Sequence, residues 1–106
     1  MAEVVWTEPA LSELDAIVDY ISLENPGAAR ELVQRIFHPV GQLADHPQGG
    51  SKPRELRGWR YRQIVEPPCR AFYREDANRV YILYVMRAEP LLRRGKLRSR
   101  AENPDE

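Results

Sequence analysis

The sequence lacks several features that would place it in a familiar class. Among its 106 residues it has one cysteine, Cys69, which excludes an intrachain disulfide and favours a reducing, cytoplasmic environment. Its longest apolar run, Val80 to Met86, has seven residues, whereas a membrane-spanning helix needs about 20. The first residues show neither the basic nor the long apolar part of a secretory signal. We therefore expect one domain over residues 1–98 and a disordered tail over residues 99–106.

The common signals of catalysis and cofactor binding are missing as well. There is no P-loop, no dinucleotide-binding glycine pattern, no zinc-ligand spacing and no nucleophile elbow. His38 and His46 lie eight residues apart around a proline, so we interpret both as surface residues. Cys69 has no activating base nearby in the sequence and is interpreted as a small buried side chain. The sequence thus predicts no metal, no cofactor and no committed catalytic residue.

The charge is balanced overall but divided between the two halves. Residues 1–50 carry eight acids and two bases, whereas residues 51–106 carry fourteen bases and eight acids. A basic half suggests a surface for an anionic partner, either nucleic acid or an acidic protein segment. The other interpretation is that these are solvated strand edges and a charged tail.

The run from Arg79 to Arg87 predicts the central strand of a sheet. It is rich in β-branched and aromatic residues. A period of two places Val80, Ile82, Tyr84 and Met86 on one face and Tyr81, Leu83 and Val85 on the other. Because both faces are apolar, we expect the strand to be covered on both sides.

Two amphipathic helices are predicted after a short strand at residues 2–6. Thr7 is a candidate N-cap for a helix that runs to about Leu23, and its apolar stripe contains Leu11, Leu14, Val18 and Ile21. Asn25 and Pro26 begin a second helix, whose apolar face carries Ala29, Leu32, Val33, Ile36 and Phe37. Pro39 predicts a kink or restart, with the helix ending by His46 and Pro47. The short connection predicts an antiparallel helical hairpin.

Three strands are predicted after a loop at residues 48–53. They span Leu56 to Val65, with Gly58 marking a bulge, then Cys69 to Arg74, and, after a turn at residues 75–78, Arg79 to Arg87. With the opening strand beside the last one, the fold class is α+β in the order β-α-α-β-β-β. A helical hairpin would pack on one face of a small, mainly antiparallel sheet. The other face would be covered by a partner or by the last residues, of which 91–98 predict a weak helix or an arm.

Basic residues are the main functional candidates. Lys52 and Arg54 precede the predicted strands, and Arg60 and Arg62 are expected on one strand face with Arg57 opposite. Further arginines on the strands are Arg70, Arg74 and Arg87, and the aromatic residues among them are Trp59, Tyr61, Phe72 and Tyr73. Such a surface can hold phosphates and stack bases, or it can bind acidic side chains of a protein. The sequence leaves both interpretations open.

An ordered set of short motifs suggests a family. The set comprises Val5 to Ala10, Leu14 to Ile17, Tyr20-Ile21, Asn25-Pro26, Ala28-Ala29, Leu43, Pro47, Gly50, Leu56, Tyr61-Arg62, Phe72 to Arg74 and Val80 to Val85. With these motifs in this order over residues 3–87, the chain resembles the ParE/RelE toxins of bacterial type II toxin–antitoxin systems and is most similar to the ParE branch.

The resemblance implies a cytoplasmic toxin that arrests growth and is held inactive, in a hetero-oligomer, by an antitoxin that wraps it. An antitoxin would also cover the open face of the Val80–Met86 strand. ParE-like toxins inhibit DNA gyrase and have no known hydrolytic chemistry. RelE-like toxins cut mRNA in the ribosome, using basic residues on the sheet and often a tyrosine or histidine near the C-terminus.

The resemblance also assigns residues to each target. For mRNA cleavage the matching basic set is Lys52, Arg54, Arg62 and Arg87. However, no tyrosine or histidine follows Tyr84, so a general acid or base is missing and gyrase, with a toxin that is not an enzyme, is the preferred prediction. The predicted target- or antitoxin-binding residues are Arg57, Arg60, Arg62, Arg74, Tyr81, Leu83 and Arg87. A ribosome-dependent endonuclease and a non-toxic binding module remain as alternatives.

Overall fold

A computed structural model describes residues 1–87 and confirms the predicted order of elements. The strands are β1 (Glu3–Trp6), β2 (Tyr61–Glu66), β3 (Cys69–Asp76) and β4 (Arg79–Arg87), and the helices are α1 (Glu8–Ser22) and α2 (Pro26–Gly41). Two short 3₁₀ turns are η1 (Gln42–Ala44) and η2 (Arg54–Leu56). The end of the last strand at Pro90, the helix or arm at residues 91–98 and the tail at residues 99–106 lie outside the described residues.

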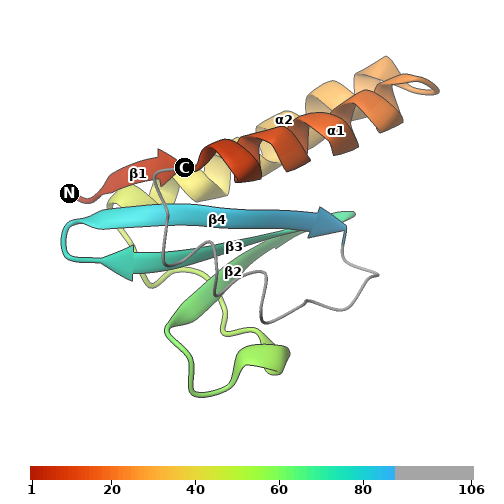
Figure 1. Cartoon of the computed structure of the whole chain (residues 1–106). Helices are drawn as coiled ribbons and strands as arrows, with labels where there is room; N and C mark the ends of the chain where they lie inside the picture. Colours follow the sequence, from red (N-terminus) through yellow and green to blue (C-terminus); the bar gives the residue numbers. More distant parts are fainter. Residues whose placement is uncertain (88–106) are drawn as a thin grey trace.

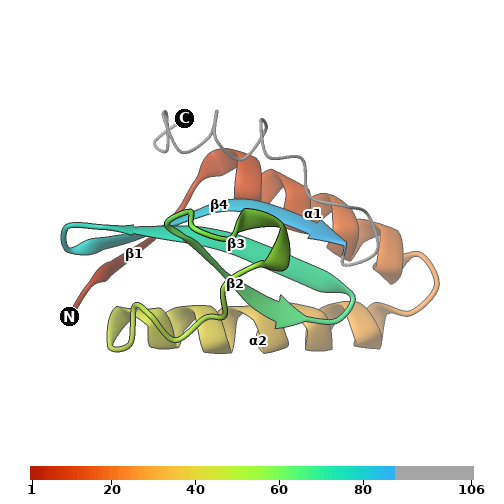
Figure 2. The ribbon, with the colours of Figure 1, turned by 90° about the horizontal axis from the view of Figure 1, so that it is seen from below.

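The sheet places β4 internally, as predicted. Its strand order is β1-β4-β3-β2, with β1 parallel to β4 and the other two pairs antiparallel. Both helices lie on one side of this sheet (Figure 1). The opposite side of the sheet, here called the second face, is turned toward the viewer in Figure 2. The α+β architecture predicted from the sequence is therefore confirmed.

Two capping residues begin the helices at the predicted positions. The hydroxyl of Thr7 accepts a hydrogen bond from the backbone N–H of Ala10 at 3.4 Å and donates one to the carbonyl of Ile82 at 2.7 Å. Thr7 therefore starts α1 and also ties the end of β1 to β4. The side chain of Asn25 accepts from the N–H of Ala28 at 3.0 Å. At Pro39 the predicted restart is wrong, because α2 runs through this residue to Gly41 and only then gives way to η1.

The main core lies between the sheet and the helices. Its most buried members are Ala10, Leu14, Leu32, Ile36, Val40, Leu43, Cys69, Ala71, Tyr73, Val80, Ile82 and Val85. Cys69 is 1% exposed, so its predicted burial is confirmed. The buried members come mainly from α1, α2, β3 and β4, and they fix the helical hairpin on the sheet.

The predicted alternation of side chains along β4 is wrong beyond Leu83. Phe72 of β3 pairs with Tyr84 but its neighbour Tyr73 pairs with Ile82, so Leu83 is an extra residue in the strand. One inserted residue of this kind reverses the alternation that follows it. As a result Val85, and not Met86, lies in the main core, while Leu83 and Met86 belong to a cluster on the second face.

The strand predicted from Leu56 to Val65 is confirmed only over residues 61–65, because residues 53–60 do not join the sheet. Residues 54–56 form η2, Gly58 has a positive φ of 82° in place of the predicted bulge, and β2 begins only at Tyr61. This 53–60 segment lies on the side of the sheet away from the helices (Figures 1 and 2). Leu56, 1% exposed, packs there in a cluster with Tyr61, Phe72, Tyr81, Leu83 and Met86. The second face is therefore partly covered by the chain itself.

The turn between β3 and β4 is shorter than predicted. Strand β3 continues to Asp76, and only Ala77 and Asn78 separate it from β4. Ala77 has a φ of 54°, as the tight turns of hairpins require.

Candidate functional site

Three predicted cations meet around one pocket at the β2 edge of the sheet. Lys52, Arg60 and Arg62 line a recess of about 210 Å³ together with Gln48, Trp59, Tyr61, Tyr73 and Glu75. We call this recess the basic pocket. Only Arg62 belongs to a strand, so the expectation that Arg60 and Arg62 share a strand face with Arg57 opposite is wrong.

Gly50 holds the loop that forms one wall of the basic pocket. Its N–H donates to the hydroxyl of Tyr73 at 2.8 Å, and its carbonyl accepts from Nη1 of Arg62 at 2.9 Å. A Cβ at this position would lie 2.5 Å from the carbonyl oxygen of Gln63 and 2.7 Å from the Tyr73 ring. Only glycine allows this approach, and Ser51 then pairs with Gln63 through two backbone hydrogen bonds of 3.0 and 2.8 Å.

The phenol of Tyr73 is kept neutral at physiological pH. Burial raises its pKa above the ordinary value of 10.0, and Glu75 acts in the same direction. The hydrogen bond from Gly50 and the positive charge of Arg62 oppose this effect but do not overcome it. Tyr73 therefore serves as a fixed hydrogen-bonding anchor for the loop and does not contribute an ionisable group to the pocket.

Unneutralised positive charge is concentrated at this edge of the sheet. Within residues 1–87 the ion pairs are Arg35–Glu66, Arg70–Glu55, Arg74–Asp76 and Arg79–Glu3. In the same range Lys52, Arg54, Arg57 and Arg60 are exposed and join none of these pairs, while Arg62 bonds only a carbonyl. Among the described residues of the basic half, most cations without a carboxylate partner therefore lie at residues 52–62.

Arg70 has a structural role that the sequence did not reveal. Its two terminal nitrogens donate to the two carboxylate oxygens of Glu55, both at 2.8 Å, and its Nε donates to Gln63 at 2.9 Å. The guanidinium also lies 4.7 Å from the centre of the Phe72 ring. Arg70 therefore fastens the 53–60 segment to the sheet and is not available to a partner.

The predicted binding residues Arg74, Tyr81 and Leu83 lie on the second face and are mostly buried. Tyr81 is 7% exposed and Leu83 is 0% exposed. Arg74 bonds Asp76 at 3.3 Å with a side chain 12% exposed, and its buried Nε has no hydrogen-bond partner.

Arg87 lies apart from the basic pocket. It pairs with Cys69 at one end of β3, whereas Arg62 pairs with Tyr73, four residues away along the same strand. At about 3.3 Å per residue the two positions are offset by roughly 13 Å along β3, and they lie on the strands at its two sides. The Arg87 guanidinium lies 5.8 Å from the centre of the Tyr20 ring. The four cations matched to mRNA cleavage therefore do not converge on one point.

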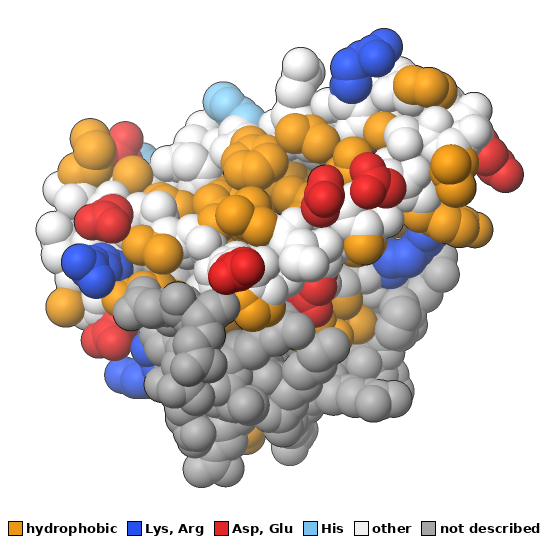
Figure 3. Space-filling view, turned by 45° about the horizontal axis from the view of Figure 1, so that its top comes forward, with side chains coloured by type: hydrophobic (Ala, Val, Ile, Leu, Met, Phe, Trp, Pro, Cys, Tyr) orange, Lys and Arg blue, Asp and Glu red, His pale blue; other side chains and the backbone are white. Residues whose placement is uncertain are grey.

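A second surface, which we call the helix groove, was missed by the sequence analysis. It has a volume of about 520 Å³ and is lined by Glu8, Leu11, Ser12, Leu14, Asp15, Val18, Val33 and Phe37. Leu11 and Phe37 are 42% and 41% exposed, so their predicted burial in the core is wrong. Trp6 extends the apolar surface, because its ring lies 4.8 Å from that of Phe37. Figure 3 shows apolar side chains gathered over the helices with acidic side chains beside them.

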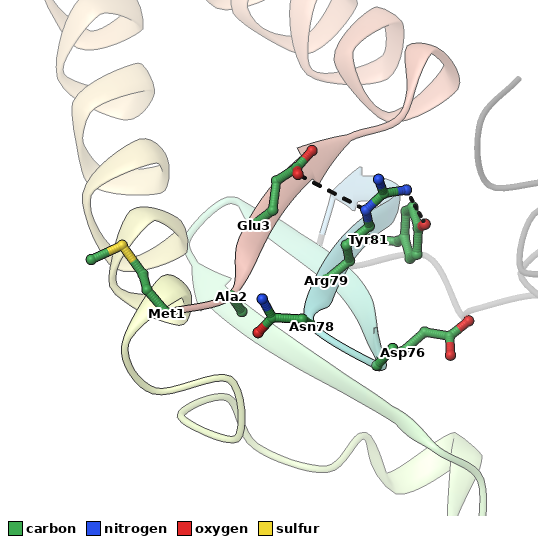
Figure 4. Close-up of a pocket in the computed structure, with 8 residues that line it drawn as sticks. Met1, Ala2, Glu3, Asp76, Asn78, Arg79 and Tyr81 are labelled. Atoms are coloured by element: carbon green, nitrogen blue, oxygen red, sulfur yellow. Dashed lines mark hydrogen bonds and ion pairs between the residues drawn. The ribbon is translucent and has the colours of Figure 1, made fainter.

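A larger hollow lies at the start of β1 and the β3–β4 turn (Figure 4). Its volume is about 750 Å³, and Arg79 is the basic side chain that lines it. Arg79 lies 3.9 Å from a carboxylate oxygen of Glu3 and donates to the hydroxyl of Tyr81 at 3.3 Å. Because its charge is already matched, this hollow is a weaker candidate than the basic pocket.

Neither a metal centre nor a membrane span is found in the described part of the chain. Residues 1–87 contain no group of three or more histidine, cysteine, aspartate or glutamate side chains placed to hold a metal ion. No helix in this range is long and apolar enough to cross a membrane.

Comparison with known proteins decides the family. Residues 4–90 match the family model of the ParE toxin of the type II toxin–antitoxin system parDE. The chain belongs to this toxin family. It is 35% identical over 95 residues to Toxin RelE2 of Caulobacter vibrioides, covering 86% of this chain and all of the relative. It is 37% identical over 83 residues to the Putative toxin Y4kP of Sinorhizobium fredii, covering 78% and 84% of the two chains.

The architecture of this ParE-family toxin agrees with that of a solved relative. The structure described as the chromosomal ParDE TA system from P. aeruginosa superimposes with a TM-score of 0.69 at 32% sequence identity. The alignment covers 84% of this chain and 98% of the other. In this toxin the basic pocket and the helix groove are therefore two surfaces of unlike chemistry on a scaffold that the solved relative shares.

Proposed function

We propose that this ParE-family toxin acts in the cytoplasm by inhibiting DNA gyrase and thereby arrests growth. The observation that carries the proposal is the match to the ParE family model over residues 4–90. The geometry supports a non-enzymatic action. Within residues 1–87 the tyrosine hydroxyl that contacts the basic-pocket loop, that of Tyr73, belongs to a residue only 1% exposed and already accepts a hydrogen bond from Gly50, which suits an anchor better than a catalytic group.

The proposal assigns the exposed cations to the target and an apolar surface to the antitoxin. Arg57, Arg60 and Arg62 would contact gyrase, together with Arg87 at the far end of the sheet. A cognate antitoxin would pack on the helix groove, where Leu11 and Phe37 are already accessible. It would also contact Arg74, Tyr81 and Leu83 and so cover the second face of β4.

The experiment is a supercoiling assay with purified gyrase and relaxed plasmid. We expect the toxin to block supercoiling and to leave linear plasmid after detergent and protease treatment, and we expect added antitoxin to prevent both. Controlled expression in a bacterium, with a DNA-damage reporter and mapping of transcript ends, supplies the second test. Unimpaired supercoiling, together with no DNA damage on expression, would remove gyrase as the target.

A ribosome-dependent endonuclease is the second candidate, favoured by one observation. Lys52 and Arg62 do share a pocket with the aromatic ring of Trp59, an arrangement that suits RNA. This function predicts new transcript ends without DNA damage. It also predicts that the Arg62→Ala, Arg87→Ala double variant loses toxicity, so full toxicity of that variant with intact transcripts would exclude it.

A further inference from the structure

The helix groove is acidic as well as apolar. Glu8 and Asp15 line it on either side of Leu11 along α1, and all three residues are exposed. Within residues 1–87 neither carboxylate joins an ion pair, and no basic side chain lines the groove. Such a surface fits a protein partner that presents an apolar side chain between two cations, because apolar parts leave water together while opposite charges meet.

The 53–60 segment carries this pattern. Arg57 and Arg60 are exposed, and Trp59 between them is half-buried. Within residues 1–87 neither arginine joins an ion pair, and the acid of the segment, Glu55, already accepts two hydrogen bonds from an arginine of β3. Tryptophan and arginine are also among the residue types most enriched where protein interfaces gain their binding energy.

The charges on the two surfaces agree in spacing as well as in sign. Glu8 and Asp15 are seven residues apart in a helix, which places them about 10 Å apart along α1. Arg57 and Arg60 are three residues apart, which a chain spans over at most about 10 Å. The groove volume of about 520 Å³ lies within the roughly 300–1,000 Å³ of pockets that enclose a ligand, so it has room for the exposed part of Trp59.

The two surfaces lie on opposite sides of the molecule. Figure 1 shows both helices above the sheet and the 53–60 segment below it. The segment therefore cannot reach the groove of its own chain, and a contact between them joins two molecules head to tail. Each molecule in such a pair still has one groove or one segment to offer, so the contact can repeat.

We propose that the helix groove binds the 53–60 segment of a second copy of this chain. Arg57 and Arg60 pair with the two carboxylates of the groove, and Trp59 packs on Leu11. The inference goes beyond the proposed function. It gives the toxin a way to cover, while no antitoxin is bound, the surfaces that we assign to antitoxin and target.

The test measures the mass of the full chain, free of antitoxin and gyrase, by sedimentation velocity over a wide range of concentrations. At low salt the mean mass should rise with concentration beyond that of two chains. At about 1 M salt, where charges are screened beyond about 3 Å, it should return toward that of one chain. Trp59→Leu should weaken the association at least tenfold.

An exchange of charges tests the pairing itself. The groove-reversed variant is Glu8→Lys, Asp15→Lys, and the segment-reversed variant is Arg57→Glu, Arg60→Glu. Each variant alone brings like charges together and should remain monomeric. In an equal mixture, the groove of either variant meets a segment of opposite charge on the other, so association beyond the dimer should return.

Glu24→Lys, Glu31→Lys is the matched control. Both residues are exposed and lie outside the lining of the groove, so this variant has the net charge of the groove-reversed one and should associate like the natural chain. If the groove-reversed variant does not fold, as judged by circular dichroism, Leu11→Ser replaces it, because this side chain is 42% exposed. Leu11→Ser should weaken the association about tenfold.

Four results would overturn the proposal. The first is a monomer at every concentration in low salt, which would leave the groove to the antitoxin alone. The second is a mass that stops at the dimer, which a repeating head-to-tail contact does not allow. The others are an equal loss in the control and the groove-reversed variant, and a mixture of reversed variants that stays monomeric. Because gyrase is absent, a negative supercoiling assay leaves these results unaffected.

Discussion

The ion pair between Glu55 and Arg70 is expected to hold the 53–60 segment on the sheet, and its removal should destabilise the whole domain. The two side chains are 23% and 12% exposed. Exposed ion pairs contribute at most about 1 kcal/mol, whereas breaking a buried pair costs about 3–5 kcal/mol. With this intermediate burial and two parallel hydrogen bonds, we expect Glu55→Gln to lower the free energy of unfolding by about 2 kcal/mol.

Urea denaturation followed by circular dichroism measures this effect. A loss of about 2 kcal/mol should lower the urea midpoint by about 1 M. The matched control is Glu66→Gln, because Glu66 lies 3.9 Å from Arg35 in a pair whose side chains are 30% and 47% exposed. This control should cost less than about 1 kcal/mol.

A double-mutant cycle shows whether the loss belongs to the pair. Arg70→Met alone leaves the Glu55 carboxylate without its bidentate partner, so it too should be destabilising. The double variant Glu55→Gln, Arg70→Met should cost less than the sum of the two single changes, by about 1 kcal/mol or more. Additive losses, or equal losses in Glu55→Gln and Glu66→Gln, would show that the pair does not fasten the segment.

Four further outcomes are expected. Gly50→Ala should cost about 1–3 kcal/mol in urea denaturation because its Cβ overlaps the Gln63 carbonyl, whereas Gly41→Ala, with nothing within 4 Å, should not destabilise. The pKa of Tyr73 is raised in the folded protein, so its contribution to the free energy of unfolding should be complete below pH 10 and should be lost as the pH rises through the pKa of the folded state. In Tyr73→Phe the free energy of unfolding should therefore decrease less over this pH range. Burial raises the pKa of the Cys69 thiol, so iodoacetamide should react with it only after unfolding. Leu11→Asp should weaken antitoxin binding in calorimetry at least tenfold without lowering the melting temperature.

Elements with a local signal could be predicted from the sequence. Thr7 and Asn25 have side chains that cap the first turn of a helix, and both do so. The apolar run at residues 80–86 could only be an internal strand, and β4 is internal. These signals depend on neighbours within a few residues, which is why one sequence suffices to find them.

Features that depend on distant contacts could not be predicted. The alternation from Leu56 to Arg62 suits a strand, and only the packing of Leu56 on the second face and the bond from Arg70 to Glu55 place that stretch elsewhere. The extra residue at Leu83 has no sequence signal, because every residue from 80 to 86 is apolar. Likewise the helical spacing of Leu11 and Phe37 is the same for a core residue as for one that lines an exposed groove.

The position of β4 has a consequence for synthesis. This strand is the last of the described elements, yet β1 at the start of the chain, the helical hairpin and β3 all pack against it. While residues 79–87 are still inside the ribosome, β1 has no strand to pair with, and the apolar stripes of the helices lack the part of the sheet on which they pack. The fold is therefore completed only after residues 79–87 have left the ribosome, so a chain that stops before β4 lacks the surfaces described above.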